Sequence, residues 1–270
     1  EDEQLAGFGD EEEITEAGDE LDGFVNAKEE AVEADASNFP TEIPAGTTYK
    51  LTEDITLAEG QQIKILEGTL DGQGHTITLS GTTLAENVSG TIQNLGVKGN
   101  ISVFTNNKGS LADTLTGTIR NSYSIVNIDD GDTWSDVGGM VGTLTGGSIE
   151  NCYFAGGGSA LMLYGIAAYN NSGASQISNC YYVASMGAFG MVSPAPQQTN
   201  CVKKTAADMK GEAVVALLNT SIAPTGYVFA YAEGSYPVLK AGTAEANWAV
   251  LDSALEKAGA LNKEEYTADT

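Results

Sequence analysis

The chain has 270 residues, of which 37 are acidic and 12 are basic, giving a formal net charge of −25. Contacts to phosphates need clusters of Lys and Arg; Arg120 is the only arginine, so we expect no nucleic-acid partner. No apolar run reaches the ~18 residues of a membrane span, so we expect no membrane insertion in this chain.

The first segment is strongly acidic. Residues 1–36 carry fifteen acidic residues and one basic residue, Lys28. Like charges repel one another, and the segment has few large apolar residues to bury, so we expect a disordered acidic leader over residues 1–37. A solvated leader or linker is favoured here over an acidic interaction tail.

Residues 38–202 are repetitive. An isoleucine recurs at intervals of 27, 30 and 28 residues, and an asparagine follows it two places later; the positions are Ile92, Ile119, Ile149 and Ile177, with Asn94, Asn121, Asn151 and Asn179. A regular period of 20–50 residues is typical of repeat architectures. The units are rich in strand-forming residues and are interrupted by turn formers, so the region is predicted to be an all-β parallel solenoid.

Stacked coils explain what is repeated. The isoleucines are expected to form one interior column, and the asparagines to occupy a corner in left-handed conformation with their amides bonded along the axis. The next position would share one inward slot, occupied by Leu95, Ser122, Cys152, Cys180 and Cys201. Packing as small buried residues is favoured for the three cysteines over a disulfide or a metal site, because their number is odd and no C-x2-C spacing occurs.

The stretch VGGMVGTLTGGSIENCY, residues 137–153, resembles the GLUG repeat. Residues 160–182 retain the second half of the pattern, and residues 104–123 follow it more loosely, with Ser122 in place of cysteine. GLUG repeats are found in large bacterial surface proteins and look like coils of right-handed parallel β-helices, with no catalytic residues assigned. The resemblance therefore implies that fold over 38–202 and an extracellular or cell-surface location.

The C-terminal third changes character. Residues 203–240 predict a short helix, with Thr205 and Asp208 as a capping-box variant at its start, followed by strands over 227–231 and 236–239. We expect this segment to cap the open end of the solenoid. Residues 241–270 read as a linker and the start of a helical module, in which ALNKEEYT resembles a FIVAR repeat.

Two sets of residues are candidate ligand sites. Exposed rings could stack on sugars, and the candidates are Trp134, Tyr164, Tyr169 and Tyr182. Carboxylates clustered on a loop can bind Ca²⁺, and the candidates are Asp129, Asp130, Asp132 and Asp136. A solvated loop is favoured over a calcium site, because the spacing is not that of an EF-hand.

No catalytic residues and no cofactor are predicted. His75 is the only histidine, and it is interpreted as a structural residue beside a turn rather than a general base. The acidic residues of 38–202 are scattered, and none is expected at matching positions of adjacent repeats, as a glycosidase pair would require.

Three functions therefore remain. The favoured one is a non-enzymatic structural or adhesion module of a secreted or wall-attached bacterial protein, with host or cell-wall glycans or surface proteins as partners. The alternative is a carbohydrate-binding module accessory to a glycan-degrading enzyme. A β-helix glycosidase or lyase is the least favoured.

Overall fold

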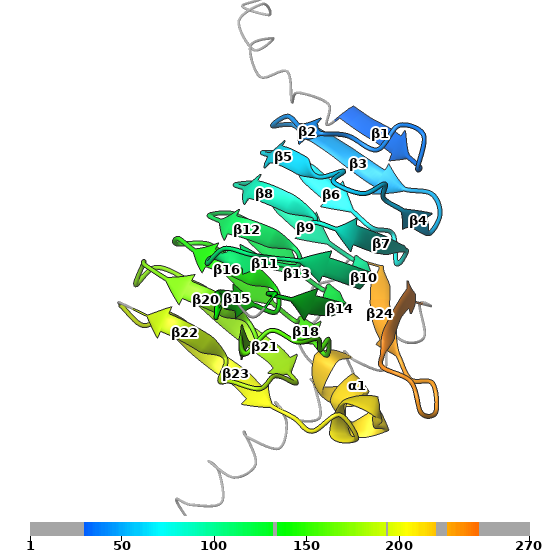
Figure 1. Ribbon diagram of the computed structural model, residues 1–270. Coiled ribbons are helices and arrows are strands. Elements are labelled where there is room, and N and C mark those ends of the chain that lie inside the picture. The colour runs from blue at the N-terminus through cyan, green and yellow to red at the C-terminus, as the bar shows by residue number, and fades with distance from the viewer. Residues whose placement is uncertain (1–29, 132–133, 193, 220–225, 243–270) are drawn as a thin grey trace, which may run out of the picture.

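The predicted solenoid is confirmed. The computed structural model describes residues 30–131, 134–192, 194–219 and 226–242, and these form a parallel β-solenoid of about six turns with one short α-helix and a C-terminal hairpin (Figure 1). Each turn of the chain passes through three walls in the same order, so that equivalent strands lie side by side along the axis.

The three walls are named in the order in which each turn visits them. Wall 1 consists of β2 (Glu42–Ile43), β5 (Ile63–Leu66), β8 (Ala85–Val88), β12 (Ala112–Leu115), β16 (Val141–Leu144), β20 (Ala167–Asn170) and β22 (Phe189–Val192). Wall 2 consists of β1 (Glu30–Ala34), β3 (Thr47–Leu51), β6 (Thr69–Asp71), β9 (Thr91–Gln93), β13 (Thr118–Arg120) and β17 (Ser148–Glu150). Wall 3 consists of β4 (Ile55–Thr56), β7 (Thr76–Gly81), β10 (Gly96–Ser102), β14 (Tyr123–Asp129) and β18 (Tyr153–Phe154).

The remaining strands join these walls. Two longer strands run through both wall 2 and wall 3, namely β21 (Gln176–Tyr182) and β23 (Gln197–Lys203). A three-stranded sheet lies between wall 3 and wall 1 in the central turns and consists of β11 (Lys108–Gly109), β15 (Asp136–Gly138) and β19 (Met162–Tyr164).

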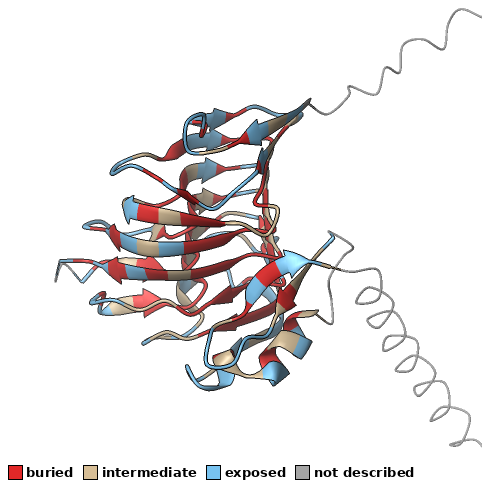
Figure 2. Cartoon of the chain, turned by 90° about the vertical axis from the view of Figure 1, so that its right-hand side faces the viewer, coloured by how far each residue is buried: buried red, intermediate tan, exposed pale blue. Residues whose placement is uncertain are grey.

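The interior isoleucine column is present as predicted. Ile119 pairs in register with Ile92 on one side and Ile149 on the other, and Ile149 pairs with Ile177. All four side chains are buried, and Leu70 extends the column by one turn. Figure 2 shows the same alternation along the strands, with buried positions between exposed ones.

The asparagine corner between walls 2 and 3 is also confirmed. Asn94, Asn121, Asn151 and Asn179 have φ values of 51°, 45°, 53° and 50°, a region that Asn tolerates better than most residues. Each amide nitrogen donates to the amide oxygen one turn before it, over 2.8, 3.2 and 2.6 Å along the series. The first amide, that of Asn94, donates to Asp71 Oδ1 over 2.9 Å, so the ladder ends on a carboxylate.

The cysteines follow this corner and are all free. Cys152 and Cys180 are fully buried, while Cys201 is half-buried in the last turn. The thiol of Cys152 donates to the carbonyl two residues earlier over 3.1 Å, as Ser122 Oγ does over 2.8 Å. Serine therefore makes the same local bond, which explains its place in the cysteine column.

Two glycines of the GLUG-like stretch, Gly138 and Gly142, let neighbouring backbones approach closely. A Cβ atom on Gly138 would lie 1.8 Å from the carbonyl oxygen of Val141, and one on Gly142 would lie 1.9 Å from that of Asn107. Both distances are far below van der Waals contact. Glycine is therefore required where β15 turns directly into β16.

The N-terminal boundary differs from the prediction. Strand β1 lies inside the segment expected to be a disordered leader, and it pairs in parallel with β3 over five residues. Val32 is half-buried and Ala34 is buried, and these two residues supply the apolar positions that the acidic composition concealed. Residues 1–29 lie outside the described part of the chain, so the rest of that prediction remains untested.

The predicted C-terminal helix and strands are present. Thr205 Oγ1 accepts from the Asp208 amide over 3.1 Å, and this capping box opens a 3-10 turn, η1 (Asp208–Lys210). Helix α1 (Glu212–Asn219) follows, and β24 (Tyr227–Ala230) pairs antiparallel with β25 (Val238–Ala241). We call residues 208–219 and 226–242 the C-terminal strap.

The position of the strap corrects the expectation of an end cap. It runs back along the asparagine corner: Asn179 donates to the Leu217 carbonyl over 3.0 Å, and Tyr227 Oη donates to Gln73 Oε1, four turns away, over 2.9 Å. Figure 1 shows β24 beside β10 and β14, while β23 remains at the open end. The physical reason is that wall 3 presents outward aromatic rings that need cover, whereas β23 exposes polar side chains. The predicted linker and FIVAR-like segment, 243–270, lie outside the described residues.

Candidate functional site

An aromatic stack projects from the outer face of wall 3. Tyr123, Tyr153 and Tyr181 are register neighbours on successive turns. The rings of Tyr123 and Tyr153 are nearly parallel, at 2°, with their centroids 5.1 Å apart. Gly96 makes room one turn earlier, since a Cβ atom there would lie 2.3 Å from Tyr123 Cζ. All three tyrosines are buried although they point away from the solenoid interior.

The C-terminal strap buries this stack. Phe229 packs against both rings, with centroids 6.5 Å from Tyr123 and 5.8 Å from Tyr153. Tyr153 Oη donates to the carbonyl oxygen of Pro237, and Asn121 Nδ2 donates to that of Tyr227 over 3.2 Å. The strap is thus held by apolar contacts and by the second hydrogen of a ladder amide.

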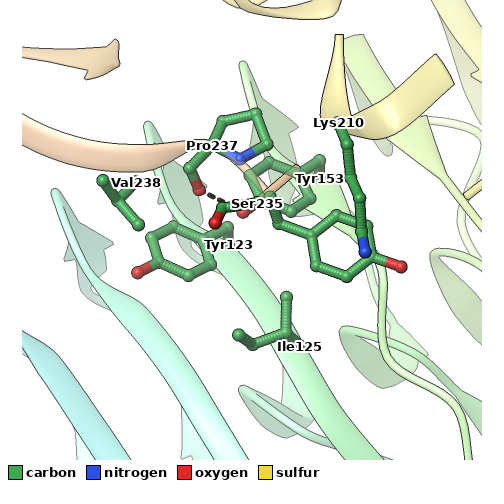
Figure 3. A pocket seen from close by; sticks show the side chains of 8 residues that line it. Tyr123, Ile125, Tyr153, Lys210, Ser235, Pro237 and Val238 are labelled. Atoms are coloured by element: carbon green, nitrogen blue, oxygen red, sulfur yellow. Dashed lines mark hydrogen bonds between the residues drawn. The ribbon is translucent and has the colours of Figure 1, made fainter. Parts of the chain in front are cut away.

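A cleft remains between the stack and the strap (Figure 3). It has a volume of about 310 Å³ and is lined by Tyr123, Ile125, Tyr153, Lys210, Ser235, Tyr236, Pro237 and Val238. Lys210 Nζ lies 4.9 Å from the centre of the Tyr236 ring, a cation–π contact. Burial raises the pKa of Tyr123, and raises that of Tyr153 well above its ordinary value, so both phenols stay neutral at physiological pH. The lining is mostly aromatic and aliphatic and includes no carboxylate, so the cleft suits binding of a small apolar group better than proton transfer.

Sequence reasoning did not select the residues of this cleft. A signal was present, because a tyrosine follows three of the four corner asparagines by two places, at Tyr123, Tyr153 and Tyr181, while Gly96 follows Asn94. The partner residues come from the strap, more than 50 residues later, and no periodicity links the two parts of the chain.

The predicted ring-stacking residues do not form one surface. Trp134 is 69% exposed and lies on a loop, and Tyr169 is half-buried on wall 1 with its hydroxyl 3.3 Å from Asp136 Oδ2. Tyr182 belongs to the solenoid core, where its ring lies against Gly165, and Tyr164 is 8% exposed. The two buried rings are unavailable to a sugar, so the prediction is corrected for Tyr164 and Tyr182.

The predicted calcium ligands are also separated. Asp129 accepts from Ser159 Oγ and from the Gly131 amide, and these bonds lower its pKa. Asp136 instead faces Tyr169, and Asp130 is buried. Asp132 lies outside the described residues. Across the described ranges, no three His, Cys, Asp or Glu side chains come together as metal ligands would.

Three pairs of ionisable side chains lie close together in the described part of the solenoid. His75 Nδ1 lies 3.4 Å from Asp54 Oδ1, and the His75 amide closes a turn on the Gly72 carbonyl, as expected for a residue beside a turn.

The expectation that no acids match between adjacent repeats is wrong for Glu86 and Asp113, which precede the register pair Asn87 and Thr114. Each binds a lysine over 2.5 Å, Lys64 and Lys108 respectively. Burial raises the pKa of Asp113, and its side chain is only 9% exposed, so this pair does not line an open groove.

Comparisons with known proteins assign no family to the chain. No family model matches the chain, and no curated protein matches it. One similar solved structure is a Bacteroides ovatus protein described as a candidate immunoglobulin A1 protease. It is 16% identical with a TM-score of 0.38, over 73% of this chain and 86% of that chain. The GLUG and FIVAR resemblances therefore stay predictions. Within the described residues, no helix combines the length and the apolar character that crossing a membrane requires.

Proposed function

We propose that this chain is a non-enzymatic solenoid module that acts as a rigid structural or adhesion element of a secreted or wall-attached bacterial protein. The observation that carries the proposal is the amide ladder, which bonds four successive turns to one another inside the corner. The strap then bonds to turns at both ends of that ladder. A wall fixed in this way holds a binding surface in constant geometry.

The extracellular part of the proposal is supported by the resemblance of residues 137–153 to GLUG repeats. The partners of such a module would be glycans of a host or of the cell wall, or surface proteins. The proposal that the chain is not an enzyme is supported by the positions of two acids on wall 2, of which Glu150 is exposed and Asp71 is buried. Asp71 and Glu150 share one column of wall 2 but are three strand spacings apart, about 14 Å. A glycosidase pair lies at roughly 5–9.5 Å.

Limited proteolysis tests the rigid-module proposal. The full chain is digested with thermolysin, and the cut sites are mapped by mass spectrometry. Cuts are expected only outside walls 1 to 3, because paired strands do not enter a protease active site. Cuts within the walls at the rate of a urea-unfolded control would contradict the proposal. Release of products from linear glycans or from peptides incubated with the chain would contradict its non-enzymatic part.

A carbohydrate-binding module is the second candidate function. The observation that favours it is Trp134, which is 69% exposed and has a φ of 57°. A bulky residue in that region is an outlier, and such outliers cluster at functional sites. A glycan array is the test, comparing the native chain with Trp134→Ala. Signals that are equal for both proteins would remove the tryptophan from the site.

A further inference from the structure

The outer face of wall 2 carries two polar columns that neither proposal above uses. The first, which we call the hydroxyl column, consists of the hydroxyl residues Thr69, Thr91, Thr118 and Ser148 and continues with the amide residues Gln176 and Gln197. The second, which we call the charged column, consists of Lys50, Asp71, Gln93, Arg120, Glu150, Ser178 and Thr199. In each column neighbouring residues are strand partners in register. They therefore repeat at about 4.8 Å along the axis.

A shallow groove lies along the hydroxyl column in the central turns, and Glu150 is the residue of the charged column that lines it. The groove has a volume of about 260 Å³, and its lining includes Thr116, Thr118, Ser148, Glu150 and Gln176. Thr118 Oγ1 and Ser148 Oγ are 3.1 Å apart, and both residues are half-buried, so these hydroxyls lie at the surface and are already aligned. The lining consists of hydroxyl, amide and carboxylate groups with glycine backbone, which suits a ligand that is itself rich in hydroxyls.

Hydrogen bonding along the charged column leaves one acceptor open at the groove. Arg120 donates to Gln93 Oε1 through Nε over 2.9 Å and through Nη2 over 2.6 Å. Gln93 in turn donates to Asp71 Oδ2 over 2.9 Å. The guanidinium thus bonds toward the preceding turn and makes no ion pair with its other register neighbour, Glu150. In the described part of the chain, no hydrogen bond or ion pair engages the exposed Glu150 carboxylate.

The arrangement selects a class of ligand. A groove whose polar groups repeat once per turn fits an extended polymer that presents hydroxyls at a similar interval. The charges of Lys50, Asp71, Arg120 and Glu150 cancel, while the net charge of −25 repels polyanions. We propose that wall 2 binds a neutral, extended, β-1,4-linked polysaccharide along the solenoid axis, with one sugar for each turn. The inference deepens the proposed adhesion role and places its ligand away from Trp134.

Calorimetry with oligosaccharides of increasing length tests this inference. The probes are β-1,4-linked oligomers of glucose, mannose and N-acetylglucosamine, from two to about six units, the number of turns. Affinity is expected to rise with length in at least one series, because each added sugar reaches the polar groups of one more turn. The double variant Thr118→Val and Ser148→Ala should weaken binding of the longest oligomer at least about fivefold, the loss of one hydrogen bond.

The matched control lies on wall 1. Thr114 and Thr143 are also register neighbours and are also half-buried, so Thr114→Val with Thr143→Val removes equivalent hydroxyls from another face. This control should bind like the native chain, and melting temperatures establish that both double variants fold. Absence of binding in all three series would overturn the inference. The inference would also be overturned if affinity did not depend on oligomer length, or if the control variant lost as much affinity as the wall 2 variant. Loss of oligosaccharide binding in Trp134→Ala would overturn it as well. Any of these leaves the rigid-module proposal standing, because proteolysis tests that separately.

Discussion

At the scale of single residues, the corner asparagines matter most. Asn121 adopts a left-handed backbone and bonds through its amide to Asn94, Asn151 and the strap. Few side chains satisfy both requirements, because most residues are strained at φ of 45° and lack a group that both donates and accepts. The repeated asparagine in the sequence is thus explained by conformation and hydrogen bonding together.

Asn121→Ala is expected to lower the free energy of unfolding by about 2–4 kcal/mol. About 1–3 kcal/mol comes from buried partners left unbonded, and roughly 1 kcal/mol comes from the left-handed backbone. Urea unfolding measures the change. Asn121→Gly separates the two contributions, because glycine removes only the amide. Asn100→Ala is the matched control, since Asn100 accepts a cross-turn amide bond at an exposed position. An equal loss in that control would contradict the ladder's role.

Because two of its cysteine thiols are buried, the folded chain is expected to lose stability at alkaline pH. Burial raises the pKa of Cys152 to about 12, whereas an unfolded cysteine ionises near 8.5. Between these values the unfolded state releases a proton that the folded state retains, so stability falls as pH rises. Below about pH 8.5 the thiol is protonated in both states, and the stabilisation that its burial as a neutral group provides is fully present.

Unfolding measured by urea between pH 8 and pH 10.5 tests this dependence. The Cys152→Ser variant should fold, because Ser122 makes the equivalent bond, and it should lose less stability over that range than the native chain. In the native chain, iodoacetamide at pH 8 should leave Cys152 unmodified and react slowly with half-buried Cys201. Rapid labelling of Cys152 in the folded chain would contradict its burial.

At the scale of elements, the C-terminal strap contacts wall 3 through residues far apart in sequence, as in the hydrogen bond from Asn121 to the Tyr227 carbonyl. Its strands and helix are predictable from local pattern, including the capping box at Thr205. Its position was not predictable, because a segment that caps the end of a solenoid and one that covers its side have the same local sequence pattern. The deciding feature is the outward tyrosine stack, which becomes apparent only when the turns are aligned.

Phe229→Ala should release the hairpin from wall 3. Phe229 is 2% exposed and contacts both stacked rings, and Phe-to-Ala changes at such sites cost about 3–5 kcal/mol. Hydrogen exchange is expected to rise in residues 226–242 and to stay low in wall 1. Tyr231→Ala, at a position 40% exposed, serves as the control. Faster exchange throughout wall 1 would show instead that the strap and the solenoid unfold as one unit.

The sequence predicted the buried columns of the solenoid correctly, but it did not predict which side chains lie at its surface. The isoleucine and asparagine columns follow from a period that every turn must satisfy. Exposure of a given tyrosine follows from which side of a strand faces outward. Tyr181 and Tyr182 are adjacent, yet one joins the outward cluster under the strap and the other the core. Composition cannot make that distinction.

At the scale of the whole molecule, the account predicts one rigid body with constant spacing between turns. Lys50 and Thr199 occupy the same charged column, six strand spacings apart, which corresponds to about 29 Å. The other columns of the solenoid share this spacing, so a distance along one of them reports on the stacking of the whole chain.

The most direct measurement is the distance between spin labels at these two positions. Lys50→Cys and Thr199→Cys are introduced into a background in which Cys152, Cys180 and Cys201 are replaced by serine, and the distance is measured by double electron–electron resonance. The account predicts a single narrow distribution near 29 Å, broadened by the label linkers. A broad distribution, or one centred far from that value, would contradict the stacking of turns on which the fold and both proposals depend.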